Sequence, residues 1–344
     1  MVTTMAPYPP ARAASTAGGY VLGRRSVVLT FGVAALGLGA CDSEPADDRE
    51  TPSQADSAGQ PGPPRPLADT DLLLETWQDT QELELLADDV SPPPEARESL
   101  TETTRILGIQ EAVLARLVRA QRGATAPLPK EVSRATQPPD VVSQTGAPRS
   151  DLGRLATALS PVEDTPQKLS AVSGSNLPTL LSLHGVRYAC AERLGSPPGR
   201  TMLAGPTRAA AITLLAGLRQ AVYGFEVLAA RSSGEERERH RSALMTLRPL
   251  TRTVTELAGP AAPAAPLGYG WEQRLETESD RRRAARELAG ALPAAVMAGA
   301  SARAGDVDAI DGSLQALAAV LGVGVAVGVP VSGFPGLTVP AFIE

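Results

Sequence analysis

The segment Ala221-Val222-Tyr223-Gly224-Phe225-Glu226-Val227-Leu228-Ala229-Ala230-Arg231 decides the fold, because it ends the first arm of a predicted helical hairpin spanning Arg208 to Leu257. The second arm opens near His240-Arg241. Apolar residues recur at helical spacing along the first arm and form one stripe; they are Ile212, Leu215, Leu218, Val222, Phe225 and Ala229. Two helices of this kind cannot close a core alone, so the hairpin predicts half of a four-helix bundle.

The composition of the 344-residue chain favours an all-α protein with room for two domains. Hydrophobic residues make up 43% of the chain, but aromatic residues only 3%. Small apolar side chains suit helix packing better than a β-sandwich, which is rich in aromatic and β-branched residues. The net charge of -6 argues against a nucleic-acid binder, since phosphate contacts need clustered Lys and Arg.

The N-terminus carries an export pattern. Arg24 and Arg25, followed by Ser-Val-Val-Leu, resemble a twin-arginine export signal. The apolar run that follows ends at Ala40 after about 14 residues, too short for a bilayer span of roughly 20. It ends in Leu-Gly-Ala-Cys41, which resembles the lipobox where a bacterial lipoprotein is diacylated on cysteine and cleaved just before it. The alternative is a chance Arg pair before an ordinary signal anchor.

Four regions are expected along the chain. Residues 1–40 form the signal peptide, and residues 41–66 form a Pro-, Gly- and Asp-rich tether that cannot offset its own ordering entropy. Residues 67–195 form a helical, diverged bundle, and residues 200–338 form a four-helix domain, with the boundary at a Ser-Pro-Pro-Gly cluster.

We expect four helical segments in the first half. The first is capped by Asp69 or Asp71 and runs to about Val90. The others span Glu95–Arg122, Asp151–Leu159 and Thr165–Leu194, and the last of them is interrupted near Gly174 and Pro178. After the hairpin we expect helices over Glu272–Arg303 and from Asp306 to about Val327. The apolar run Leu317 to Val331 contains three glycines and is too short to span a membrane alone, so it predicts a buried last helix.

The C-terminal half resembles an uncharacterised actinobacterial ferritin-like domain family found in exported lipoproteins. The resemblance rests on Ala221 to Arg231, His240-Arg241 and the later Phe334-Pro335-Gly336-Leu337, and covers roughly Thr207 to Leu337. The segment from Leu180 to Cys190 resembles the last helix of a diverged bundle that precedes this domain in longer members. The resemblance implies a ferritin-like four-helix bundle and brings no known activity with it.

Ferritin-like metal sites use Glu on two helices and Glu-x-x-His on two others. This chain departs from that pattern, since Arg237 stands three residues before His240 and Leu181 three before His184. Glu226 and His240 are the remaining metal candidates, paired across the hairpin. For both His184 and His240 we expect a hydrogen-bonded structural side chain, and not a metal ligand.

Two further groups allow two interpretations. Glu75, Asp79 and Glu82 share helical spacing, which permits a di-iron reading but fits a solvated acidic face better because no histidine lies near them. Cys190 is left alone once Cys41 carries lipid, so it is either a reactive thiol or, as we expect, a small buried apolar residue.

These observations predict a noncatalytic envelope lipoprotein at the extracytoplasmic face of the membrane, held by lipid on Cys41. It would bind no cofactor and would present a surface to an envelope protein or cell-wall component. The alternative is a metal-binding or oxidative ferritin-like protein with a degenerate carboxylate and histidine site for iron or manganese.

Overall fold

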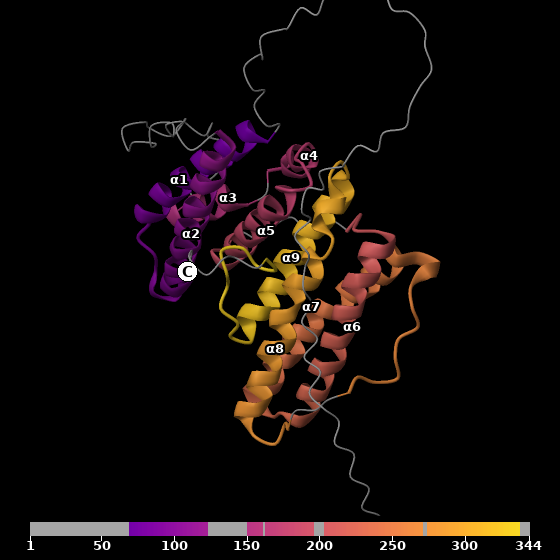
Figure 1. Ribbon diagram of the computed structural model, residues 1–344. Helices are drawn as coiled ribbons and strands as arrows, with labels where there is room; N and C mark the ends of the chain where they lie inside the picture. Colours follow the sequence, from indigo (N-terminus) through magenta and orange to yellow (C-terminus); the bar gives the residue numbers. More distant parts are fainter. Residues whose placement is uncertain (1–68, 123–149, 161, 196–202, 271–273, 338–344) are drawn as a thin grey trace, which may run out of the picture. The chain divides into compact units, whose positions relative to one another are not determined.

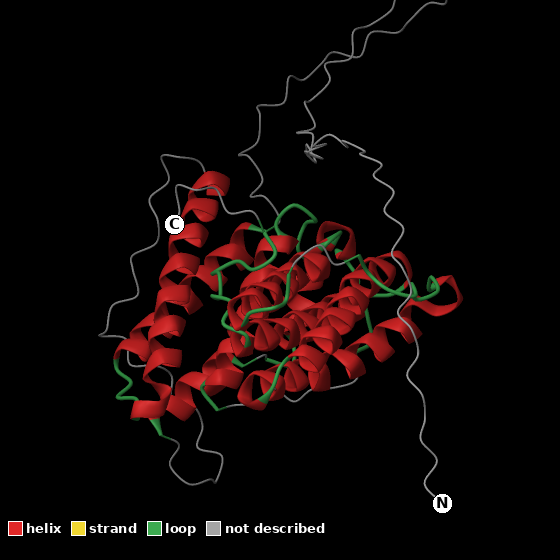
Figure 2. Cartoon of the chain, turned by 90° about the horizontal axis from the view of Figure 1, so that it is seen from below, coloured by secondary structure: helices red, strands yellow, loops and turns green. Residues whose placement is uncertain are grey.

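The computed structural model describes residues 69–122, 150–160, 162–195, 203–270 and 274–337, and all regular structure within these ranges is helical (Figure 1, Figure 2). The predicted all-α class is therefore confirmed for this part of the chain. The α-helices are α1 (Thr70–Asp88), α2 (Arg97–Arg122), α3 (Asp151–Leu159), α4 (Thr165–Ser170), α5 (Leu177–Arg193), α6 (Arg208–Arg231), α7 (Gly234–Ala258), α8 (Glu278–Met297) and α9 (Val307–Ala326). Short 3₁₀-helices η1 (Pro94–Ala96), η2 (Gly259–Ala261) and η3 (Ala300–Arg303) join them.

Helix ends follow local side-chain chemistry. The third helix of the C-terminal half is shorter than the predicted Glu272–Arg303, because Thr277 starts α8 in a capping box with Asp280. Gly299, at φ 69°, then follows its end in the left-handed region that favours glycine. The last helix begins where the sequence predicted, and Asp306 caps it by accepting from the backbone N–H of Ala309 at 2.9 Å.

Asp69 does not cap α1, contrary to the sequence prediction. Its side chain makes no hydrogen bond to the first turn of that helix. The carboxylate instead accepts from the Ser173 backbone N–H at 3.0 Å, the Ser173 hydroxyl and the Asn176 amide at 2.6 Å. These donors outcompete the helix N–H groups, and Asp69 consequently ties the start of α1 to the start of α5.

Helices α6, α7, α8 and α9 form a closed ring. Helix α6 contacts α7 and α8, and α9 contacts the same two helices. Arg281 at the start of α8 pairs with Glu236 at the start of α7, so these two helices run in the same direction. A long connection from Gly259 to Thr277 returns the chain to that end. It lies along α6, where Arg219 donates to the Pro263 carbonyl at 2.6 Å (Figure 1).

Helices α1, α2, α3 and α5 repeat this arrangement. Helix α1 contacts α2 and α3, and α5 contacts the same two helices. The starts of α1 and α5 lie together through Asp69, just as Gly205, which precedes α6, packs on Gly312 in α9. The first half therefore forms a second four-helix ring in which α5 occupies the place of α9.

Helices α5 and α9 join the two rings and are buried on nearly all sides. They approach closely at Gly185, where an added Cβ would lie 2.5 Å from Cδ2 of Leu317. Buried residues from both halves belong to one continuous hydrophobic core. All described residues lie in one compact unit.

Two segments cross between the rings. The segment after α5 passes over α9, where a Cβ on Gly312 would lie 1.8 Å from the Gly205 carbonyl oxygen. The segment after α9 passes over α5, where the Ser182 hydroxyl donates to the Pro335 carbonyl at 2.8 Å. The predicted domain boundary at residues 196–199 lies outside the described residues.

Helices α6 and α9 are each long and apolar enough to cross a membrane by length and composition. Both helices pack against other helices of the protein. Helix α6 contacts α7 and α8, whereas α9 packs between the two rings. Most of the apolar stretch of α9 is buried inside the protein.

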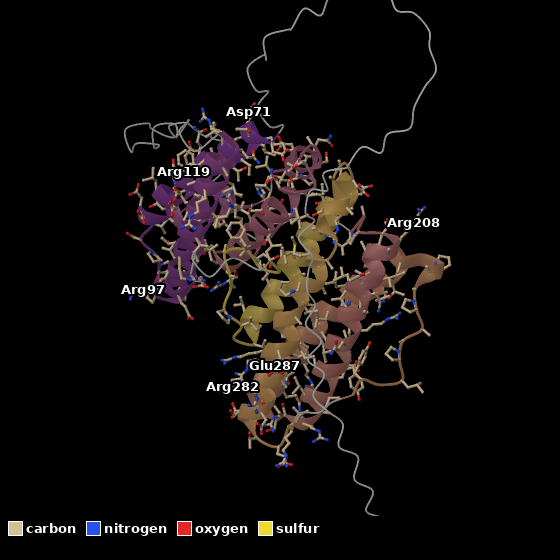
Figure 3. All side chains as sticks on the ribbon, viewed as in Figure 1. Asp71, Arg97, Arg119, Arg208, Arg282 and Glu287 are labelled. Atoms are coloured by element: carbon tan, nitrogen blue, oxygen red, sulfur yellow. The ribbon has the colours of Figure 1, made fainter. Side chains whose placement is uncertain are left out.

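The charged side chains of Asp71, Arg119, Arg208 and Arg282 project outward from their helices (Figure 3).

Gly185→Ala should lower the free energy of unfolding by about 1–3 kcal/mol, because the added methyl group meets Leu317 in a closely packed crossing. Urea unfolding followed by circular dichroism measures this change. Gly290→Ala in α8 is the matched control, since its Cβ would have no neighbour within 4 Å and should stabilise the helix by about 0.5–1 kcal/mol. Equal effects of the two substitutions would contradict the close crossing.

Candidate functional site

The two metal candidates of the hairpin lie in different surroundings. Glu226 is exposed on α6 and accepts a hydrogen bond from Arg248 of α7 at 2.8 Å. His240 is only 3% exposed and lies in the second turn of α7. The carboxylate that sequence reasoning paired with His240 is thus engaged with a cation on the surface.

His240 has a structural environment. Its Nδ1 atom lies 3.2 Å from the Ser232 hydroxyl, which itself donates to the Leu228 carbonyl at 2.8 Å. The hydrogen bond between Ser232 and His240 joins the end of α6 to α7, and the tautomer of the imidazole sets which of the two groups donates. The ring also packs 6.0 Å from Phe225. Burial lowers the pKa of His240 below 6.5.

An ion pair fastens the same end of the bundle. Glu236, one turn before His240, accepts two hydrogen bonds from Arg281 at 2.7 and 3.0 Å. Both side chains are mostly buried, so this pair is better shielded from solvent than the surface pairs of Arg282 and Arg283. His240, Ser232 and the Glu236–Arg281 pair therefore hold α6, α7 and α8 together at the hairpin turn.

The carboxylates of α1 form a solvated face. Glu75, Asp79 and Glu82 are exposed, and Glu75 pairs with Lys168 of α4 at 3.1 Å. No group of three or more His, Cys, Asp or Glu side chains able to hold a metal ion occurs in the described part of the chain.

A buried polar cluster, here called the Arg187 network, lies at the centre of the first ring. Arg187 of α5 donates from Nε to the Gln110 side-chain oxygen at 3.1 Å and from Nη2 to the Thr80 hydroxyl at 2.5 Å. The Gln110 amide donates onward to the carbonyls of Leu183, at 3.4 Å, and Gly333, at 3.3 Å. Thr80, Gln110 and Arg187 come from α1, α2 and α5 and are all buried. The network thus connects three helices of the ring with the segment after α9.

Arg187 carries a charge into this interior. Burial lowers the pKa of its guanidinium to about 10, so the group stays protonated at neutral pH. None of the ion pairs among the described residues includes it. Its hydrogen-bond partners are neutral oxygens of Thr80 and Gln110, and the negative charge of Asp79 acts on it without a hydrogen bond and opposes the lowering of its pKa.

The buried polar residues of the two rings do not fit the carboxylate-bridged metal ions of ferritin-like metal sites. A divalent cation about 5 Å from the Arg187 guanidinium would be repelled by roughly 3 kcal/mol per unit of its charge at an effective dielectric of 20. In the second ring the buried cation is Arg303. Its guanidinium bonds the Ser313 hydroxyl at 2.7 Å and the Val296 carbonyl at 2.8 Å, near the end of α8. Both arrangements favour anionic or neutral oxygen partners over a metal ion.

Two further titratable side chains of α5, those of His184 and Cys190, have shifted pKa values. His184 is half-buried, and burial together with the positive charges of Arg187 and Lys168 lowers its pKa to about 3. Cys190 is buried as predicted, and burial raises the pKa of its thiol. A raised pKa keeps the sulfur protonated and poorly nucleophilic.

Sequence reasoning missed the Arg187 network. One signal was available: Arg187 interrupts an otherwise largely apolar stretch from Leu180 to Ala191. A charged residue in a helix that is apolar on every face must find buried hydrogen-bond partners. Gln110 and Thr80 could not be identified as those partners, because they are 77 and 107 residues away.

Arg24, Arg25 and Cys41 lie outside the described residues, so the export signal and lipidation site stay predictions. Comparisons with protein-family models, curated proteins and solved structures find no match for this chain.

The stability of the protein should fall as the pH decreases from 7.5 to 5.5. His184 and His240 have pKa values below 6.5 in the folded state, so the unfolded chain binds more protons in this range. Urea midpoints at the two pH values measure the effect. The double variant His184→Gln, His240→Gln should show a flatter pH dependence. If the double variant loses as much stability between pH 7.5 and 5.5 as the wild type does, groups other than the two histidines cause the pH dependence.

Proposed function

We propose that the chain is a noncatalytic lipoprotein, anchored through lipid on Cys41 to the extracytoplasmic face of the cell membrane. The tether of residues 41–66 holds the helical unit away from the lipid surface. In this role the two rings present a binding surface to an envelope protein or a cell-wall component. The export and lipobox patterns around Arg24, Arg25 and Cys41 support the location.

The two rings are proposed to be ferritin-like bundles. Support comes from the order of neighbours in the second ring and from its single long connection, between α7 and α8. One crossover of this kind between the second and third helices is typical of ferritin-like folds. The first ring has the same neighbours, and its second and third helices are joined by residues 123–150.

The Arg187 network is the observation that carries the noncatalytic assignment. Ferritin-like enzymes collect several carboxylates and histidines around their metal ions. Here the centre of the first ring holds a guanidinium with a threonine and a glutamine. Such a centre stabilises a packed interior and gives no route to binding or activating oxygen through a metal.

The metal content of the protein tests this assignment. Protein lacking the first 41 residues, purified from cells supplied with iron and manganese, should contain far less than one metal ion per chain. His240→Gln should leave that content unchanged and cost about 1 kcal/mol of stability at most, through one lost hydrogen bond. Stoichiometric metal that disappears in His240→Gln, with helical circular dichroism retained, would establish a metal site instead.

Lipid attachment is tested separately in cells. Cys41→Ala should abolish incorporation of a fatty-acid probe. Replacing both signal arginines, Arg24→Lys with Arg25→Lys, should block export, because a twin-arginine signal requires both guanidinium groups. Cys190→Ala is the matched control and should label normally, since its thiol is buried. Labelling of the Cys41→Ala protein would show that the lipobox interpretation is wrong.

A further inference from the structure

The segment after α9 is held in the manner of a bound peptide. Residues 331–337, here called the strap, follow a reversal at Gly328, whose φ is +81°. The strap lies on α2, α5 and α8, all of which are far from it in sequence. Its contact residues form the strap-binding surface: Arg105, Ile109 and Gln110 of α2, Ser182 of α5, and Pro293 and Met297 of α8.

Side-chain donors bind the strap at every second carbonyl. Arg105 donates to the Val331 carbonyl at 2.5 Å, Gln110 to the Gly333 carbonyl at 3.3 Å and Ser182 to the Pro335 carbonyl at 2.8 Å. Val331 and Gly333 lie before a turn over Phe334 to Leu337, in which the Leu337 N–H donates to the Phe334 carbonyl at 3.3 Å, and Pro335 lies inside that turn. Hydrogen bonds from side chains to these main-chain carbonyls hold the strap without depending on the identity of its own side chains.

Three strap positions give the surface its sequence preference. A Cβ on Gly333 would lie 2.6 Å from Cγ2 of Ile109, and a Cβ on Gly336 would lie 2.6 Å from the Pro293 carbonyl oxygen. Gly336 also has φ +79°, which other residues rarely adopt. Between the glycines, Phe334 is buried to 2% exposure in the core. The surface is thus complementary to the order Gly-Phe-Pro-Gly.

We propose that the strap-binding surface is a peptide-recognition site for segments in which Gly-Phe-Pro-Gly forms a turn, and that the strap occupies it as an intramolecular ligand. This inference rests on the proposed role as a binding module and names the class of ligand. Gln110 bonds both the strap and Arg187, so the occupied site is connected directly to the interior of the first ring. In the resting protein the tethered strap outcompetes free peptide, because a short tether gives an effective concentration in the millimolar range.

The test uses the chain from residue 42 onward, with Phe334→Ala to weaken the strap, and a fluorescent peptide of residues 329–337. Fluorescence anisotropy should show saturable binding to the variant at least tenfold tighter than to the wild type. A peptide with Gly333→Val should bind at least tenfold more weakly than the parent, since its side chain meets Ile109. A peptide with Pro330→Ala is the matched control and should bind like the parent, because Pro330 is exposed.

Circular dichroism of the Phe334→Ala variant separates recognition from folding. If this variant loses its helical signal, Gly333→Ala, which weakens the strap at its contact with Ile109 and leaves the strap-binding surface unchanged, replaces it in the assay. A folded variant that fails to bind the peptide overturns the proposal, as does equal binding to wild type and variant. Neither result depends on lipid or metal, so each leaves the proposed location and noncatalytic role untouched.

Discussion

The close approach of α5 and α9 at Gly185 and Leu317 is the constraint on which the rest of the structure depends. Each ring alone would leave one helix with an apolar outer face, since both α5 and α9 are buried nearly all round only when they meet. A glycine at the crossing lets the two backbones come close enough to exclude water. The two halves therefore share one core, even though each has its own set of neighbouring helices.

Buried cations give this core its specificity. Arg187 and Arg303 are each surrounded by neutral oxygens, in positions where burial alone disfavours a charge. Arg303 satisfies carbonyls at the end of α8, which would otherwise lack partners. Arg187 fixes the spacing of α1, α2 and α5 through directed bonds, where apolar packing would permit several alignments. Purely hydrophobic replacements could be equally stable but would select the native arrangement less strictly.

The positions of most helices could be predicted from the sequence, because helical periodicity and helix-breaking residues are properties of neighbouring residues along the chain. The hairpin from Arg208, the start of the last helix at Asp306, the breaks near Gly174 and the burial of Cys190 all follow from neighbouring residues. Contacts between distant segments were not readable. Asp69 had a suitable cap position, yet donors at Ser173 and Asn176 captured its carboxylate. The partners of Arg187 and the seating of Phe334 likewise depend on tertiary packing.

The reciprocal crossing of the segments after α5 and α9 has a consequence for the symmetry of the molecule. Gly205 rests on α9 at Gly312, and Pro335 rests on α5 at Ser182, and each contact falls at the sixth residue of its helix. In an isologous interface around a two-fold axis, each contact from the first subunit to the second is repeated from the second subunit to the first. The two halves of the single chain are thus related to each other as the subunits of a segment-exchanged dimer are, although their interiors differ.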